Sequence, residues 1–117
     1  MARNRAPITK QSRREGYALH PKAHRIMVKK ATPPGQHGRN RQSRGSQYSQ
    51  QLREKQKVKR LYGLLEKQFR RIYGEAVKDS EPTGVALMRM LEQRVDNAVH
   101  RAGFAPSRQA ARQLVSH

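Results

Sequence analysis

Apolar residues recur at steps of three and four along the second half of the chain, and this spacing predicts amphipathic helices. One apolar stripe crosses residues 64–78, and a longer one crosses residues 85–102. A third, made of Ala111, Leu114 and Val115, follows Ser107, a good N-cap residue, and ends shortly before the last residue. No stretch of the sequence alternates between apolar and polar residues as a half-buried strand does. The pattern therefore predicts a mainly α-helical fold.

Glycine and proline mark where these helices should end. Residues 79–84 contain Pro82 and Gly84, and we expect them to connect the first two stripes. Gly103 follows the long stripe and suits the left-handed position at a helix C-terminus, because it lacks Cβ. Gly74 lies inside the first stripe, where it costs ~1 kcal/mol relative to alanine. That helix therefore needs support from tertiary packing.

A more polar helix is predicted from residue 46 to residue 62. Ser46 or Ser49 can cap it, and Gly63 is expected to follow its last turn. Its apolar side is narrow. The helix should therefore lie on a binding partner or on a second helix rather than be enclosed.

Residues 1–46 show no sustained hydrophobic period. Proline and glycine are frequent there and break helices and strands alike. Short turns are possible around Arg13, Arg14 and residues 20–24, and the rest is expected to be extended basic chain that becomes ordered on a binding partner. The predicted architecture is this extended segment followed by a small helical bundle.

The formal net charge of +18 indicates that the chain binds a partner of opposite charge. Residues 1–60 hold 17 of the 26 Lys and Arg residues but only two of the eight acidic residues. Such a charge disfavours compaction of the isolated chain, so we expect a polyanionic partner: nucleic acid, an anionic membrane or an acidic protein. Neutralising phosphates releases counterions, which drives association without reading a base sequence.

The sequence lacks the residues for several kinds of site. It has no cysteine, which excludes disulfides and thiolate zinc sites. His20 and His24 could share one helix face, but two imidazoles are too few for a metal site, so no metal or cofactor is predicted. The apolar runs are too short to span a membrane. No carboxylate pair, activated nucleophile or phosphate-binding loop is present, so we predict that the chain is not an enzyme.

Five short motifs occur in order along the chain: SRREG at residues 12–16, PGQHG at 34–38, QLREKQK at 51–57, LEQRVDN at 91–97 and ARQLVSH at 111–117. Together they resemble the family of ribosomal protein S-four of the bacterial small subunit, and the resemblance covers essentially the whole chain. One motif alone would be weak evidence. Five in the right order and near the right spacing are specific.

The resemblance implies a division into three parts. Residues 1–46 would be the extended rRNA-binding segment, residues 47–93 a helical domain, and residues 94–117 the first two helices of an S-four-type RNA-binding module. In the family a small β-structure follows these helices, and the chain continues well beyond it. We therefore expect a fragment in which the β part of this module is missing.

The resemblance also implies a function. Members of the family are structural constituents of the small ribosomal subunit, bind its 16S-type rRNA early and organise the 5′ domain. They contact neighbouring small-subunit proteins, lie near the channel through which mRNA enters and are linked to translational accuracy. The expected location is the cytoplasmic ribosome. The alternative is a non-specific, nucleoid-type nucleic-acid-binding protein, which would explain the charge but not the ordered motifs.

Arginine and polar residues supply the expected RNA contacts in the N-terminal segment. Arg13 and Arg14 are adjacent, and each can donate two hydrogen bonds to a phosphate. Gln36 and His37 lie between glycines that let the backbone approach RNA closely, although an ordinary surface turn is the alternative. The other contacts expected near the N-terminus are Arg3, Arg5 and Lys10.

Three arginines follow the PGQHG motif within six residues: Arg39, Arg41 and Arg44. A basic loop of this kind can follow a single strand electrostatically. By resemblance it lies near incoming mRNA. Plain contact with rRNA phosphates is the alternative.

Two lines of basic residues run along the polar helix predicted from residue 46. The first is Arg53, Lys57 and Arg60, and the second is Lys55 and Lys59. Glu54 alone cannot compensate five cations. We therefore expect both lines to face RNA.

The last two predicted helices carry the remaining candidate residues. Arg94 and Asp96 are two positions apart, which is the wrong spacing for a direct pair on a helix; by resemblance they orient the start of the module. The amides at the N-terminus of the last helix attract phosphate. The RNA contacts expected there are Ser107, Arg108, Arg112 and His117.

Overall fold

The computed structural model describes residues 4–30, 32–35 and 46–117. This described part contains seven helices and no strand, which confirms the mainly α-helical fold. The chain divides into two compact units, Met1–Leu61 and Tyr62–His117. Each unit is described by itself below.

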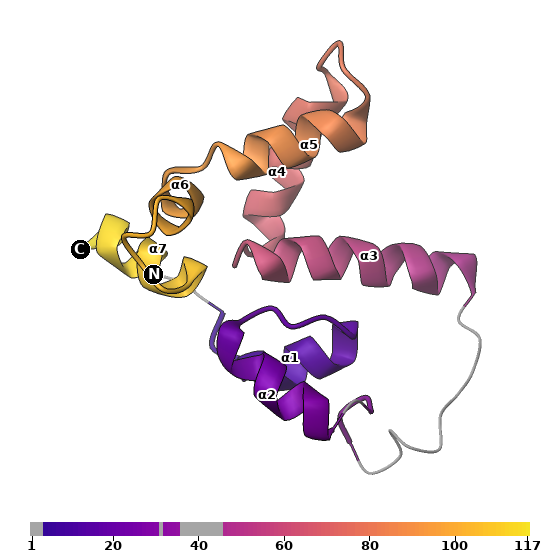
Figure 1. The fold of residues 1–117 in the computed structure, drawn as a ribbon. Helices are drawn as coiled ribbons and strands as arrows, with labels where there is room; N and C mark the ends of the chain where they lie inside the picture. Colours follow the sequence, from indigo (N-terminus) through magenta and orange to yellow (C-terminus); the bar gives the residue numbers. More distant parts are fainter. Residues whose placement is uncertain (1–3, 31, 36–45) are drawn as a thin grey trace. The chain divides into compact units, whose positions relative to one another are not determined.

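The first unit contains α1 (Ile8–Glu15), α2 (Pro21–Lys29) and α3 (Gln47–Leu61). Helix α1 packs against both α2 and α3, and Figure 1 shows α1 and α2 side by side. The polar helix predicted from residue 46 is therefore confirmed as α3. It lies on a second helix, one of the two surfaces expected for so polar a sequence.

Two of these helices fall in the segment that was expected to be extended, and that expectation was wrong for them. Proline occupies the first turn of α2, where its missing N–H costs no hydrogen bond. The His20 ring nitrogen Nδ1 accepts a hydrogen bond from the backbone N–H of Lys22 and caps the helix. Burial and the nearby Lys22 charge lower the pKa of His20, which favours the neutral ring that can accept this bond.

A buried serine ties α1 to the turn that follows it. The Ser12 hydroxyl donates to the Ile8 carbonyl oxygen at 2.7 Å and accepts from the Leu19 N–H at 3.2 Å. Gly16 ends α1 with a φ of 64°, a left-handed conformation that glycine adopts without a steric penalty. Leu19 and Ala23 are buried, as is Ser12. Hydrophobic periodicity did not predict these helices because their core is small and partly polar.

The second unit contains α4 (Glu66–Val77), α5 (Thr83–Glu92), α6 (Val95–Arg101) and α7 (Arg108–Ser116). Helix α4 packs on α5 and α6 packs on α7, as Figure 1 shows. The buried apolar residues come from α4, α5, α7 and the loops beside the helices, whereas the buried residues of α6 are polar: Tyr62, Leu64, Phe69, Ile72, Ala76, Ala86, Leu91, Ala105 and Ala111 are apolar, and Asp96 and Asn97 are polar. The two apolar stripes at residues 64–78 and 85–102 supply most of this core.

The single helix predicted for residues 85–102 is in fact two helices. Arg94 has extended backbone angles, with φ −62° and ψ 142°, and separates α5 from α6. The Asn97 side chain donates to the Glu92 backbone oxygen at 2.8 Å, and the Asp96 carboxylate accepts from the Asn97 N–H. These side chains satisfy backbone groups that a continuous helix would have paired, so apolar periodicity alone could not detect the break.

The helix boundaries predicted near the end of the chain are confirmed. Gly103 has a φ of 87° after α6. The Ser107 hydroxyl accepts a hydrogen bond from the Ala110 N–H at 3.1 Å and caps α7. Both signals depend on residues close in sequence, which is why they could be predicted.

Candidate nucleic-acid interface

The basic stripe on α3 converges on one buried carboxylate of α1. Glu15 Oε1 accepts hydrogen bonds from Nη1 of Arg53 at 3.0 Å and from Nη1 of Arg60 at 2.6 Å. The Glu15 side chain is fully buried, whereas those of Arg53 and Arg60 are 37% and 21% exposed. The two arginines therefore hold α3 against α1 and still reach the surface.

Lys57, the third member of the stripe, also has partners within the first unit. Its ammonium nitrogen lies 3.3 Å from a Glu54 carboxylate oxygen and 5.9 Å from the centre of the Tyr17 ring. Lys55 and Lys59 are half-buried. The prediction counted Glu54 as the one acidic partner available to the basic residues of α3, and that was wrong, because Glu15 also pairs with Arg53 and Arg60 from another helix.

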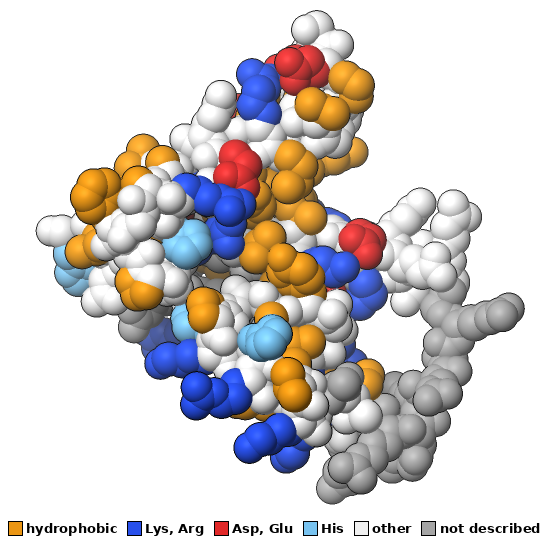
Figure 2. All heavy atoms as spheres, viewed as in Figure 1, with side chains coloured by type: hydrophobic (Ala, Val, Ile, Leu, Met, Phe, Trp, Pro, Cys, Tyr) orange, Lys and Arg blue, Asp and Glu red, His pale blue; other side chains and the backbone are white. Residues whose placement is uncertain are grey.

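Arg13 is held against the chain that follows α2. Its guanidinium donates to the Thr32 backbone oxygen at 3.0 Å and to the Pro33 backbone oxygen at 3.4 Å. Its neighbour Arg14 is exposed, as are Arg5 and Lys10. On the face drawn in Figure 2, several Lys and Arg side chains gather on the part of the first unit formed by its N-terminal helices.

Some of the predicted RNA-binding residues lie outside the part of the chain that the structure describes. They are Arg3, Gln36, His37, Arg39, Arg41 and Arg44. Their predicted contacts stay predictions.

A second polar cluster lies in the second unit and is centred on Glu92. Its carboxylate accepts from the Tyr62 hydroxyl at 2.5 Å, from the Asn97 side-chain amide at 2.7 Å and from the Arg101 guanidinium at 3.0 Å. These hydrogen bonds, first that of Arg101 and then that of Tyr62, lower the pKa of Glu92 to about 2. Burial and the hydrogen bond to Glu92 raise the pKa of Tyr62 to about 12.

The predicted RNA-binding arginines of α7 are attached to this cluster or lie beside it. Arg108 donates to the Asn97 side-chain oxygen at 3.0 Å and lies 5.0 Å from the centre of the Tyr62 ring. Arg112 donates to the Gly63 backbone oxygen at 2.5 Å. Tyr62, Glu92, Asn97 and Arg108 thus form a closed ring of contacts that orients α7.

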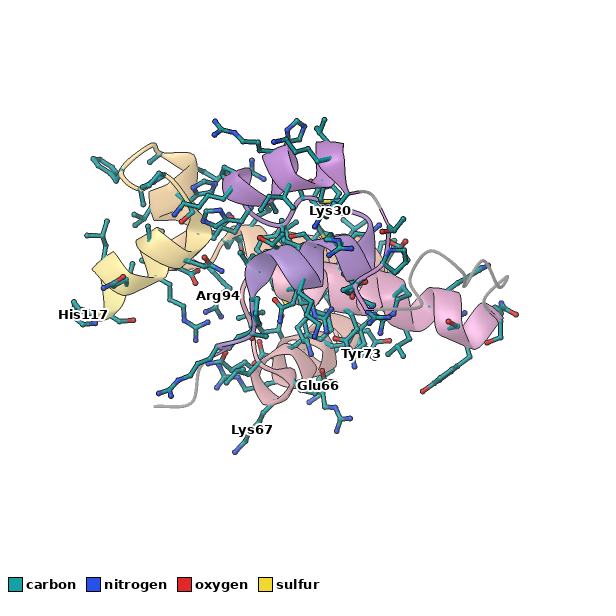
Figure 3. All side chains as sticks on the ribbon, turned by 90° about the horizontal axis from the view of Figure 1, so that it is seen from below. Lys30, Glu66, Lys67, Tyr73, Arg94 and His117 are labelled. Atoms are coloured by element: carbon teal, nitrogen blue, oxygen red, sulfur yellow. The ribbon has the colours of Figure 1, made fainter. Side chains whose placement is uncertain are left out.

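The start of α6 differs from the prediction. Arg94 Nε lies 3.3 Å from Asp96 Oδ1, although the two residues were predicted not to pair. The prediction assumed a continuous helix, but Arg94 precedes the first residue of α6 and its extended backbone brings the two side chains together. Figure 3 labels Arg94, which precedes α6, and also His117 at the exposed end of the chain.

Two searches cover only the residues that the structure describes. Within residues 4–30, 32–35 and 46–117, no three His, Asp or Glu side chains come together in a way that could hold a metal ion. In the same ranges, no helix combines the length and the apolar character needed to cross a membrane.

Family models account for the chain from residue 3 to residue 117. The model for the ribosomal protein S4/S9 N-terminal domain matches residues 3–92, and the model for the S4 domain matches residues 93–117. The chain belongs to the ribosomal protein S4 family. The resemblance carried by the five sequence motifs is thereby confirmed.

Relatives at high identity agree with the family models. The chain is 58% identical to small ribosomal subunit protein uS4 of Pelodictyon phaeoclathratiforme, 59% to that of Chlorobium phaeovibrioides and 56% to that of Chlorobaculum tepidum. Each alignment covers 100% of this chain and 58% of the relative. The chain therefore spans little more than half the length of these members of the S4 family.

The Glu92 cluster contains residues from both of the regions that the family models match. Tyr62 and Glu92 fall in the region matched as the S4/S9 N-terminal domain, whereas Asn97, Arg101 and Arg108 fall in the region matched as the S4 domain. The hydrogen bonds of Glu92 thus join the two family regions where they meet in sequence.

Sequence analysis missed the two carboxylates that organise these clusters in this member of the S4 family. Glu15 is one of only two acidic residues among the first 60, and it lies inside the SRREG motif. Glu92 lies inside the LEQRVDN motif. An isolated acid within a motif and surrounded by cations is the signal that could have identified Glu15, because a buried anion needs paired cations.

Proposed function

We propose that this chain is a structural constituent of the small ribosomal subunit that binds 16S-type rRNA directly and early, and so organises the 5′ domain. The single observation that carries the proposal is the 56–59% identity to proteins named small ribosomal subunit protein uS4 along the full length of the chain. The segregation of 17 Lys and Arg residues into residues 1–60 supports it, because rRNA phosphates would neutralise this charge.

The binding surface that we propose combines free and anchored cations. Arg5, Lys10 and Arg14 are exposed and can reach phosphates by adjusting their side chains. Arg53 and Arg60 are held in place by intramolecular hydrogen bonds, so they would meet RNA in a fixed geometry. Positioned arginines suit a folded RNA of defined shape, and mobile cations add affinity that is independent of shape.

The helix α7 contributes a second proposed contact. Its N-terminus is capped by Ser107, and Arg108 and Arg112 lie on adjacent turns. Both arginines already donate to groups of the second unit, which leaves part of each guanidinium for a phosphate. His117 at the exposed end of the chain would extend this surface.

Finer aspects of the proposal come from the family. We propose contact with neighbouring small-subunit proteins, a location on the cytoplasmic ribosome near the channel through which mRNA enters, and a role in translational accuracy. Arg39, Arg41 and Arg44 are the residues that we propose for contact with mRNA, with Arg3, Gln36 and His37 contributing to rRNA binding. We propose no catalytic activity and no cofactor.

One observation favours a second candidate function. The charge of +18 would by itself bind any nucleic acid, as a nucleoid-type protein does. The ribosomal candidate requires a folded RNA of defined shape, whereas the non-specific candidate requires only a high density of phosphates. A non-specific polycation should bind duplex DNA and folded rRNA alike.

The test is a titration of the chain with a 5′-domain fragment of small-subunit rRNA and with duplex DNA of equal length, each at two salt concentrations. With ~6–10 phosphate contacts, both affinities should fall ~10³–10⁵-fold between 50 and 200 mM salt. The proposal requires that a clear preference for the rRNA remain at the higher salt. Equal affinities that disappear together would overturn it in favour of the non-specific alternative.

A further inference from the structure

A buried carboxylate is an unexpected centre for a surface that binds phosphate. Glu15 is one of two acids among the first 60 residues, and its side chain is fully buried. Its Oε1 accepts from both Arg53 and Arg60, while Oε2 is buried without a hydrogen-bond partner among the described residues. Oε1 therefore holds two guanidinium groups together, while the other oxygen of the same carboxylate accepts no hydrogen bond from the described residues.

The arrangement leaves donors available on the outer side of the pair. The described part of the chain gives a partner to Nη1 of Arg53 and to Nη1 of Arg60, and to none of their other nitrogens. Both side chains are partly exposed. Each guanidinium has five N–H donors in one plane, so each can bind Glu15 along one edge and an external oxygen along another.

We propose that Glu15 is a specificity-determining residue for RNA binding, which holds Arg53 and Arg60 together as one site for a single RNA phosphodiester group. This inference rests on the proposed function. It goes further by naming the ligand group and by assigning a positive role in RNA binding to a negatively charged residue.

The charges of the cluster fit this ligand. Two guanidinium groups and one carboxylate leave a single positive charge, and a phosphodiester carries a single negative charge. Because the guanidinium groups bind the same carboxylate oxygen, their Nη1 atoms are close together, and their outer edges can approach two oxygens of one phosphate. The carboxylate also removes the rotamer freedom that free arginine side chains would lose on binding.

The inference predicts opposite effects of Glu15 on two kinds of binding. Non-specific binding to duplex DNA depends on how many cations neutralise phosphates, so a buried anion should weaken it. Binding to a folded rRNA depends on where those cations lie, so the same anion should strengthen it. Removing the Glu15 charge therefore separates positioning from simple attraction.

Glu15→Gln and Glu54→Gln form a matched pair, because each removes one negative charge from the first unit and Glu54 is 71% exposed. Affinities are measured for the 5′-domain rRNA fragment and for duplex DNA in the same salt. Glu54→Gln is expected to raise both affinities by a similar factor. Glu15→Gln is expected to lower the preference for rRNA about tenfold, the effect of one charge-assisted contact. An unchanged preference in a folded Glu15→Gln chain would overturn the inference.

Circular dichroism of each variant establishes that its helices are intact at the temperature of the titration. If Glu15→Gln loses helix content, the inference is tested with the double variant Arg53→Lys/Arg60→Lys. This variant keeps both positive charges but replaces each planar guanidinium with an ammonium group, which cannot donate two parallel hydrogen bonds. Its control is Arg70→Lys/Arg71→Lys, at two exposed arginines of α4. Loss of the rRNA preference in the first double variant alone supports the inference, and equal behaviour of the two overturns it.

The unmodified chain separates this inference from the proposed function. If it shows no preference for rRNA over duplex DNA, the proposed function fails and the inference fails with it. If it shows the preference and Glu15→Gln retains it, only the role of Glu15 is wrong.

Discussion

The hydroxyl of Tyr62 donates a 2.5 Å hydrogen bond to the carboxylate of Glu92, thirty residues later in the chain. Tyr62 is only 4% exposed and precedes α4, while Glu92 is the last residue of α5. Arg101 and Asn97 bind the same carboxylate from α6. The bond therefore joins the chain before α4 to the end of α5 and the start of the S4-domain region.

Tyr62→Phe should lower the free energy of unfolding by about 1–2 kcal/mol, because it removes the hydroxyl and leaves the ring and its packing in place. Glu92 would keep its bonds from Arg101 and Asn97, so the second unit should still fold. The measurement is urea unfolding followed by circular dichroism. Tyr73→Phe is the control, since Tyr73 is 48% exposed and should change stability little. Equal midpoints for the two variants would contradict the prediction.

The stability of the chain should depend on pH through Glu92. The folded-state pKa of Glu92, about 2, lies below its ordinary value of 4.5. The ionised carboxylate thus stabilises the folded state above pH 4.5, and this contribution is lost as the pH falls from about 4.5 to about 2. Urea midpoints measured across this window should fall more steeply for the unmodified chain than for Glu92→Gln. Parallel pH profiles would show that the Glu92 pKa is not depressed.

The Tyr62 hydroxyl should ionise only at high pH. Its pKa is raised from 10.0 to about 12, so the protonated hydroxyl stabilises the fold below pH 10 and this contribution is lost between pH 10 and about 12. An ultraviolet absorbance titration should show a late phenolate component that Tyr62→Phe removes. Tyr48→Phe is the control, because Tyr48 is 76% exposed. A late component that survives in Tyr62→Phe would belong to another tyrosine.

Ser12→Ala should destabilise the first unit by ~1–3 kcal/mol, because the buried Leu19 N–H would lose its acceptor. The same substitution removes the bond from the Ser12 hydroxyl to the Ile8 carbonyl oxygen. Urea unfolding measures the effect, with the exposed Ser116→Ala as a control that should stay within ~0.5 kcal/mol. A Ser12→Ala midpoint as high as that of the control would mean that the hydroxyl does not contribute to stability.

Local signals in the sequence predicted most of the helical architecture. The stripes at residues 64–78 and 85–102, the cap at Ser107 and the left-handed Gly103 depend on residues within one or two turns of each other. Such interactions leave a periodic or positional trace in the sequence. The family is also a property of the sequence, because ordered motifs and high identity require no coordinates.

The helices of the N-terminal segment and the break at Arg94 left weaker traces. Helices α1 and α2 depend on a buried hydroxyl, a histidine cap and one left-handed glycine rather than on a broad apolar face. The break depends on the side chain of Asn97 satisfying the backbone of Glu92. Polar groups that form hydrogen bonds with the backbone have no fixed period in the sequence. Hydrophobic spacing therefore could not predict these helices or this break.

The sequence by itself determined the family, the helical class, the excess of cations in residues 1–60 and the arginines that we propose as RNA contacts. Only the tertiary structure decided how those arginines are held. Arg53 meets Glu15 across 38 residues, and Arg112 meets the Gly63 carbonyl oxygen across 49. A hydrogen bond acts over about 3 Å, and pairs so distant in sequence reach that distance only after the helices have packed.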